Sequence, residues 1–154
     1  MAQQAKFLFD SCCFGRVALK QLLEFVGSAG GEAEIAHLSQ FQLDNKRDDE
    51  WVPQFVEEGW IVISSDRGTT PSKGSKLPLL CRRFGITHVL LSAAVHDLST
   101  REKCRAIAAV WSDLLALPDH PRGSEHRLQK THSGGFVLKH AKPRGDSSSG
   151  QAVR

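Results

Sequence analysis

Short apolar runs alternate with amphipathic stretches along most of this chain. The apolar runs predict strands at residues 6–10, 32–38, 60–64 and 88–91, and the amphipathic stretches predict helices at 16–26, 49–58, 78–83 and 99–115. Strands that alternate with helices form a parallel sheet with helices on both faces. The alternation therefore predicts an α/β fold, namely a three-layer α/β/α sandwich around a central parallel sheet.

The character of the sequence changes at Pro118. Residues 118–124 resemble a linker, and two polar-apolar alternations at 125–132 and 136–141 flank the turn Ser133-Gly134-Gly135. This pattern predicts a C-terminal β-hairpin arm. Because an isolated hairpin is marginally stable, the arm should pack either on the sheet or on a partner. The expected division is a domain at 1–117, a linker and hairpin at 118–141, and a disordered tail at 142–154.

Composition narrows the class of protein further. A chain of 154 residues with a net charge of +3 suits one globular domain, and the mild basic bias permits a polyanionic partner without demanding one. No apolar run approaches the ~20 residues of a membrane span, and the N-terminus lacks a signal peptide pattern.

The four cysteines lack C-x-x-C spacing, so we expect free thiols in a reducing cytoplasm. The seven histidines lack zinc-site spacing and are predicted to be surface residues.

Aspartates stand at the ends of the apolar runs. Asp10 follows the first expected strand and Asp66 the third, and ligands bind at the carboxyl ends of parallel strands. The helix that starts near Asp48 runs antiparallel to the strands, so its first turn should reach the same edge. Acids in a first turn also stabilise a helix, and Asp48 is expected to be its N-cap, which is a second explanation for Asp48 and Asp49. Carboxylates gathered at one edge repel unless a cation lies between them, so the pattern predicts a divalent metal site.

The loop at 67–76 brings positive charge to the same edge. It carries Arg67, Lys73 and Lys76 among glycine and serine residues, which suits a nucleic-acid backbone. Hard cations such as Mg²⁺ or Mn²⁺ prefer oxygen ligands and can activate water against a phosphodiester. The chain has neither a P-loop nor a G-x-S-x-G elbow, so other phosphate-binding and hydrolase sites are disfavoured.

Three motifs occur together in this order: a strand that ends FLFD, a D-x-x-W helix start, and a G-W-x-V-x-[ST]-x-D strand. They resemble the PIN-like nucleases, and most closely the VapC-type toxin subgroup. The resemblance spans about residues 6–115. It implies an α/β/α sandwich with a central parallel sheet and an endoribonuclease activity that depends on Mg²⁺ or Mn²⁺.

The resemblance also implies roles for individual residues. Asp10 matches the first-strand aspartate, Asp48 the acid at the helix start with Asp49 as a neighbouring candidate, and Asp66 the third-strand aspartate. Asp10, Asp48 and Asp66 would be catalytic, and all four aspartates are candidate metal ligands. Ser64 takes the position of a hydroxyl residue two before the third aspartate, and would contact substrate together with the basic residues of the loop.

The chain departs from the family pattern at one point. Many members carry a further acid just after the third strand, where this chain has Arg67 and Gly68. A fourth ligand would then have to come from Glu50 or Asp97.

The leading hypothesis is a metal-dependent ribonuclease that acts as the toxin of a toxin–antitoxin pair. RNA, a cognate antitoxin protein and a second copy of the chain are the partners to consider. Two alternatives stay open. One is a non-catalytic PIN-like binding domain that acts through its C-terminal arm. The other is a receiver-like signalling domain with Asp66 as phosphoacceptor, although Cys12-Cys13 stands where that family has an acidic pair.

Overall fold

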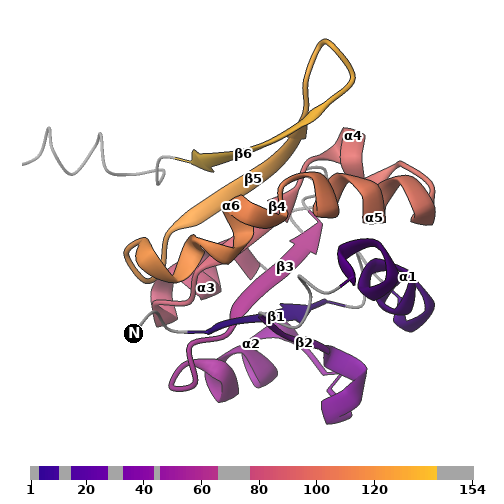
Figure 1. The fold of residues 1–154 in the computed structure, drawn as a ribbon. Coiled ribbons are helices and arrows are strands. Elements are labelled where there is room, and N and C mark those ends of the chain that lie inside the picture. Colours follow the sequence, from indigo (N-terminus) through magenta and orange to yellow (C-terminus); the bar gives the residue numbers. More distant parts are fainter. Residues whose placement is uncertain (1–3, 11–14, 28–32, 44–45, 66–76, 142–154) are drawn as a thin grey trace, which may run out of the picture.

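A computed structural model describes residues 4–10, 15–27, 33–43, 46–65 and 77–141 of the protein. The described residues form one six-stranded sheet in the order β2-β1-β3-β4-β5-β6 (Figure 1). Its strands are β1 (Ala5–Phe9), β2 (Ala33–His37), β3 (Ile61–Ser65), β4 (His88–Leu91), β5 (Glu125–Lys130) and β6 (Phe136–Ala141). The first five strands are parallel, and β6 is antiparallel to β5.

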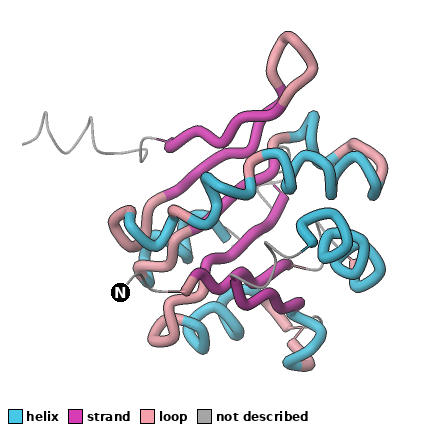
Figure 2. The backbone as a smooth tube through the Cα atoms, viewed as in Figure 1, coloured by secondary structure: helices cyan, strands magenta, loops and turns pink. Residues whose placement is uncertain are grey.

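Helices cover both faces of this sheet. They are α1 (Arg16–Val26), α2 (Asp48–Trp51), α3 (Leu77–Phe84), α4 (Ala93–His96), α5 (Thr100–Ala109) and α6 (Trp111–Leu115), with 3-10 turns η2 (Leu38–Phe41), η3 (Val52–Phe55) and η4 (Leu117–Asp119). Helices α1, α5 and α6 pack on one face, and α2, η3 and α3 on the other (Figures 1 and 2). The predicted α/β/α sandwich is therefore confirmed.

Strand β3 shows why the strands of this sheet appear in the sequence as continuous apolar runs. Ile61 and Ile63 belong to the core under α1, α5 and α6, whereas Val62 belongs to the core under α2 and α3. Successive side chains of a strand point to opposite faces, so a strand covered on both faces needs apolar residues at every position. The first polar side chains of β3 are Ser64 and Ser65, at its carboxyl end.

The predicted hairpin is confirmed, and it continues the central sheet. Strand β5 pairs in parallel with β4, and β6 returns antiparallel along β5. Leu128 is fully buried under the α5 face, and Phe136 and Leu138 pack against the same core. The hairpin thus packs on the sheet, which is one of the two placements that the sequence left open. The predicted disordered tail at 142–154 lies outside the described residues.

The helix expected at 49–58 differs from the structure. Helix α2 begins at Asp48 with Arg47 as its N-cap, and ends after one turn at Trp51, where η3 takes over. Pro53 explains the early end, because it lacks the backbone N–H that would bond back to residue 49. The expectation that Asp48 itself caps the helix is therefore wrong.

The long helix expected at 99–115 also departs from the prediction. Ser99 caps α5 and accepts the N–H of Glu102 at 3.2 Å. The helix then breaks at Val110, which has φ −109° and ψ 20°, and resumes as α6. Helix α4 was not predicted, because four residues are too few to show a helical period. Within the described ranges, no helix is long and apolar enough to span a membrane.

Candidate functional site

Asp10 lies at the topological switch point of the sheet. Strand β1 is flanked by β2 on one side and β3 on the other, and Asp10 follows it directly. Its backbone N–H donates to the carbonyl oxygen of Ile63 at 3.0 Å, which fixes it beside the end of β3, and the residue is 7% exposed. In open α/β sheets, ligands bind at the carboxyl ends of the strands that flank such a point.

Asp48 is the first residue of α2, on the face of the sheet that α2 and α3 cover. One of its carboxylate oxygens, Oδ1, accepts the indole N–H of Trp51 at 3.1 Å. Trp51 is 1% exposed and belongs to the core under α2 and α3. A buried indole therefore holds the Asp48 carboxylate in place.

Three carboxylates act on the buried thiol of Cys81. Burial raises the pKa of this thiol far above its ordinary value, and the negative charges of Asp48, Asp10 and Glu125 raise it further. Cys81 is fully buried in α3. Asp10, Asp48 and Glu125 therefore all act electrostatically on Cys81, and Glu125 does so from the first residue of β5, at the opposite edge of the sheet from Asp10.

Asp49 and Glu50 have other partners. The guanidinium of Arg47 binds Asp49 with both arms, Nε to Oδ1 at 3.1 Å and Nη2 to Oδ2 at 2.6 Å. This hydrogen-bonded pair lowers the pKa of Asp49 and raises that of Arg47. Glu50 Oε2 accepts the backbone N–H of Arg47 at 3.0 Å, so it closes the first turn of α2. Both acids therefore bond the N-cap residue of α2, as is usual for acids in the first turn of a helix.

Two serines end β3, and each bonds a histidine. Ser64 Oγ lies 2.6 Å from Nε2 of His88, and both residues are 1% exposed. Ser65 Oγ lies 2.6 Å from Nδ1 of His96 at the end of α4. Burial lowers the pKa of His88 to about 3, with a smaller contribution from the positive charge of Arg127. Within the described part of the chain, His88 Nδ1 has no hydrogen-bond partner.

These histidines correct the sequence-based interpretation. His37, His88 and His126 are buried, not surface residues as predicted. Each lies in a strand, and the apolar run that begins at His88 was the one available sign of its burial. The partners Ser64 and His88 are 24 positions apart, so no local pattern could have paired them.

The remaining predicted site residues are Asp66, Arg67, Lys73 and Lys76, and they lie outside the described residues. Asp66 directly follows Ser65, the last residue of β3. Asp97 is the C-cap of α4 and is exposed. Among the side chains that the structure describes, no three His, Cys, Asp or Glu residues are grouped as a metal site.

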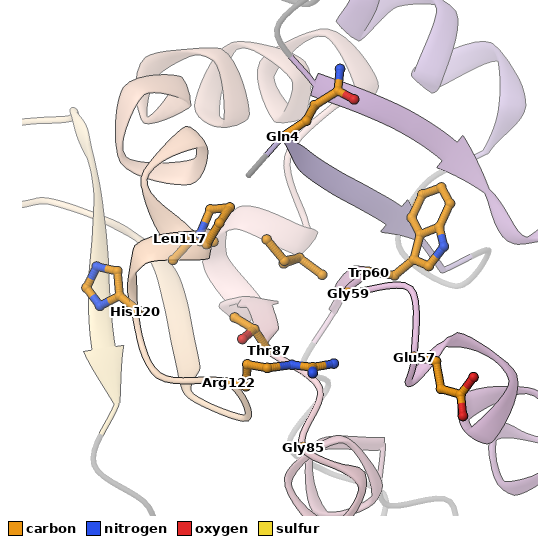
Figure 3. Close-up of a pocket in the computed structure, with 11 residues that line it drawn as sticks. Gln4, Glu57, Gly59, Trp60, Gly85, Thr87, Leu117, His120 and Arg122 are labelled. Atoms are coloured by element: carbon orange, nitrogen blue, oxygen red, sulfur yellow. The ribbon is translucent and has the colours of Figure 1, made fainter. Parts of the chain in front are cut away.

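A small cavity of about 90 Å³ lies at the opposite edge of the sheet (Figure 3). It is lined by residues that precede the strands, among them Gln4, Trp60 and Thr87. Arg122 extends beside it and donates from Nη2 to the carbonyl oxygen of Val56 at 2.6 Å. The strands separate this cavity from Asp10, so it is distinct from the candidate site.

A cluster of histidines lies beside the hairpin. His126 and His140 are register partners on β5 and β6, with stacked rings 4.8 Å apart, and His120 packs edge-on at 5.2 Å from His126. His126 Nε2 lies 2.9 Å from Ser124 Oγ. Burial lowers the pKa of His126 to about 4, and the two neighbouring rings add to the effect. The cluster therefore keeps a neutral imidazole at its centre at neutral pH.

Comparison with known proteins gives one match. Residues 5–73 match the family model described as a PIN like domain. Neither the curated proteins nor the solved structures contain a match to this chain. The matched stretch begins with β1 and includes Asp10, Asp48 and Asp66, and it ends before α3. Together with the fold, the match supports a PIN-like domain that starts at the first strand and contains the three predicted aspartates.

Proposed function

We propose that this protein is a metal-dependent endoribonuclease that acts as the toxin of a toxin–antitoxin pair. The observation that carries the proposal is the place of Asp10, which is buried directly after β1 and bonded to the end of β3 at the switch point of the sheet. Asp48, whose carboxylate accepts the indole N–H of Trp51, is the second ligand in the proposal. The family match over the same residues favours nuclease chemistry.

In the proposal, the bound ion is a hard divalent cation such as Mg²⁺ or Mn²⁺. Such ions take carboxylate oxygens and retain several waters, so a few acidic side chains suffice. Asp10 and Asp48 supply two of them, and Asp66 is the third ligand in the proposal. The bound cation would activate water and stabilise the charge that develops on the phosphodiester.

The protein's own residues would position the site and the substrate. The indole of Trp51 orients Asp48, and the backbone bond from Asp10 to Ile63 sets the distance between β1 and β3. The basic side chains Arg67, Lys73 and Lys76 would bind the RNA backbone, which makes binding strongly dependent on salt. Ser64 is buried against His88, so its role in the proposal is to support β3, and substrate contact falls to the basic loop.

The receiver-like alternative has one observation in its favour. The order β2-β1-β3-β4-β5 also occurs in receiver domains, so strand order alone does not distinguish the two functions. Labelling with acetyl phosphate separates them. A receiver would form an acyl phosphate on Asp66 that hydroxylamine cleaves, whereas the nuclease would form none.

Cleavage of RNA by purified variants tests the proposal. Asp10→Asn and Asp66→Asn should abolish Mn²⁺-dependent cleavage while thermal unfolding stays cooperative. Asp113→Asn changes an exposed acid of α6 and should cleave as the wild type does. In cells, expression of the wild type should arrest growth, and Asp10→Ala should relieve the arrest. Full cleavage by Asp66→Asn would overturn the assignment.

A further inference from the structure

Strand β6 is an edge strand of the sheet and is held by few buried side chains. Among the described strands it pairs only with β5, at the outer side of the sheet (Figure 1). Phe136 and Leu138 pack against the core under α5 but are only partly buried, and Lys139 and His140 are exposed. Segments with few buried apolar contacts open locally at lower cost than interior strands. Strand β6 can therefore separate from β5 while the rest of the sheet stays folded.

The two ends of the hairpin are held in different ways. At the turn, the N–H of Thr131 donates to the carbonyl oxygen of Gly135 at 2.8 Å, and the N–H of Gly135 donates to Oγ1 of Thr131 at 3.0 Å. At the open end, His126 of β5 faces His140 of β6, one register position before the end of the ladder. Strand ends that no turn connects fray most readily. The two histidines therefore lie where the hairpin opens first.

Three imidazole rings, from His120, His126 and His140, make the contact at this open end, and we call them the histidine cluster. The rings of His126 and His140 stack at 4.8 Å, and the ring of His120 lies 5.2 Å from the first and 6.2 Å from the second. Neutral rings in stacked and edge-on arrangements attract one another. Protonated rings at these distances repel, because they lie within the Debye length of about 8 Å at physiological salt.

The surroundings of His126 oppose a positive charge on its ring. The residue is 2% exposed, and its Nε2 lies 2.9 Å from Oγ of Ser124. Burial lowers the pKa of His126, and the charges of His140 and His120 lower it further. Among the described groups that act on this ring, none is a carboxylate. A proton on His126 therefore meets both burial and like charge.

The charged neighbours of the cluster have other positions or partners. Glu125 and Arg127 flank His126 in β5, but they point to the opposite face of the sheet, where they pair at 3.7 Å. Lys139 is the register partner of Arg127 and shares that face. In α5, which contacts β6, Glu102 pairs with Arg105 at 3.4 Å and Lys103 adds positive charge. The other charged groups on the elements around the cluster are exposed, namely Asp113, Asp119, Arg122 and Lys130.

We propose that the histidine cluster makes the attachment of β6 dependent on pH: neutral rings hold the strand on β5, and protonated rings repel one another and release the open end of the hairpin. Release separates the rings and gives His126 access to water, so the open state binds a proton that the closed state excludes. It also uncovers the edge of β5 and the apolar side chains of Phe136 and Leu138. The inference concerns the hairpin alone and does not depend on the proposed function.

The direction of the pH dependence follows from the two states of His126. In the closed hairpin the pKa of His126 is lowered to about 4, whereas in the open hairpin it returns toward the ordinary value of 6.5. Above about pH 6.5 the ring is neutral in both states, so opening does not depend on its protonation. As the pH falls from 6.5 toward 4, only the open state gains this proton, and its population should rise by about tenfold per pH unit.

Hydrogen exchange of the backbone amides of β6 measures this opening in the full-length chain. After correction for the intrinsic exchange rate at each pH, the opening constant of these amides should rise by about tenfold from about pH 6.5 to about pH 5.5. The amides of β1 are the internal control, because β1 lies inside the sheet and exchanges only when the whole domain opens. Their opening constant should rise less than that of β6.

Matched variants identify the titrating group. His126→Gln removes the proton site but keeps an amide near the position of Nε2, within reach of Ser124, and should abolish most of the pH dependence of β6 opening. His140→Phe keeps a stacked ring that carries no charge and should weaken the dependence as well. His132→Ala changes an exposed histidine of the hairpin turn and should behave as the wild type does.

Three results would overturn the inference. One is an opening constant of β6 that stays constant between about pH 6.5 and about pH 5.5 in the wild type. Another is an equal rise for the amides of β1 and β6, since the acid-sensitive step would then be unfolding of the whole domain. The third is full pH dependence in both His126→Gln and His140→Phe, because the titrating group would then lie outside the stacked pair.

Discussion

The hydroxyl oxygen of Ser64 lies 2.6 Å from Nε2 of His88, and both side chains are buried. Ser64 lies near the end of β3, and His88 is the first residue of β4. The bond therefore runs diagonally between two neighbouring strands. Burial depresses the pKa of His88 to about 3, so the imidazole is neutral in the folded protein at physiological pH.

This neutral histidine predicts an acid-sensitive fold. In the unfolded chain His88 takes up a proton near its ordinary pKa of 6.5, whereas the folded protein resists protonation down to about pH 3. Above about pH 6.5, His88 is neutral in both states and the free energy of unfolding does not depend on its protonation. As the pH falls from 6.5 toward 3, the unfolded chain gains a proton that the folded protein refuses, so the free energy of unfolding decreases. One such group contributes a slope of about 1.4 kcal/mol per pH unit in that window.

Urea denaturation between pH 4 and 8 measures this slope. The double variant Ser64→Ala/His88→Leu removes the titrating group and its hydroxyl partner, so its free energy of unfolding should vary less with pH. His126 contributes in the same direction and should leave a residual slope, because its pKa is also lowered by burial. An unchanged slope in the double variant would show that His88 is not the acid-sensitive group.

The acids at the start of α2 should differ in their effect on activity. Asp49 is engaged by both arms of Arg47, whereas Asp48 is held toward the core by Trp51. We therefore expect Asp48→Asn to lower Mn²⁺-dependent cleavage by about 100-fold, and Asp49→Asn to leave it within about twofold. Steady-state cleavage kinetics at saturating Mn²⁺ provide the comparison. Equal losses in the two variants would mean that Asp49 shares in metal binding.

The cysteine in α3 should be chemically inert. Burial and the charges of Asp48 and Asp10 raise the pKa of Cys81, so little thiolate forms at neutral pH, and burial also raises the pKa of Cys104. In a Cys12→Ser/Cys13→Ser background, a thiol reagent at pH 8 should label neither cysteine until denaturant is added. Rapid labelling of the folded protein would contradict the burial of these thiols.

The aromatic contact between β1 and α6 should contribute strongly to the stability of the fold. Phe7 is fully buried in β1, and its ring lies 5.4 Å from that of Trp111. Phe7→Ala should cost about 3–5 kcal/mol in the free energy of unfolding, because it leaves a cavity in the central strand. Val17→Ala, an exposed position of α1, is the control and should change little. Chemical denaturation of the two variants makes the comparison.

Much of the fold was predictable because most strands and helices show a clear hydrophobic pattern within their own segment of the sequence. Strand β4 coincides with the predicted range 88–91, and α1 with 16–26, since each is a short run with one clear pattern. The break at Val110 and the four-residue helix α4 were not predictable, because tertiary packing sets them and they leave no period in the sequence.

The site was predictable only in part, because contacts between distant segments leave no local pattern in the sequence. Element order predicted Asp10 and Asp48 at one edge, and the structure places Asp10 directly after β1, bonded to the end of β3. The distinction between Asp48 and Asp49 depends on which partner each side chain meets, and adjacent acids look alike in sequence. The bond between Ser65 and His96 joins distant segments and had no local signal.

The central claim is that Asp10 and Asp48 hold a divalent cation together with Asp66. Calorimetric titration of Mn²⁺ into the wild type and into Asp10→Asn tests it most directly, with circular dichroism to show that both are folded. The account predicts saturable binding to the wild type and loss of that binding in Asp10→Asn, because an amide cannot replace the carboxylate charge. Absence of binding in the wild type, or equal affinity in the two proteins, would contradict it.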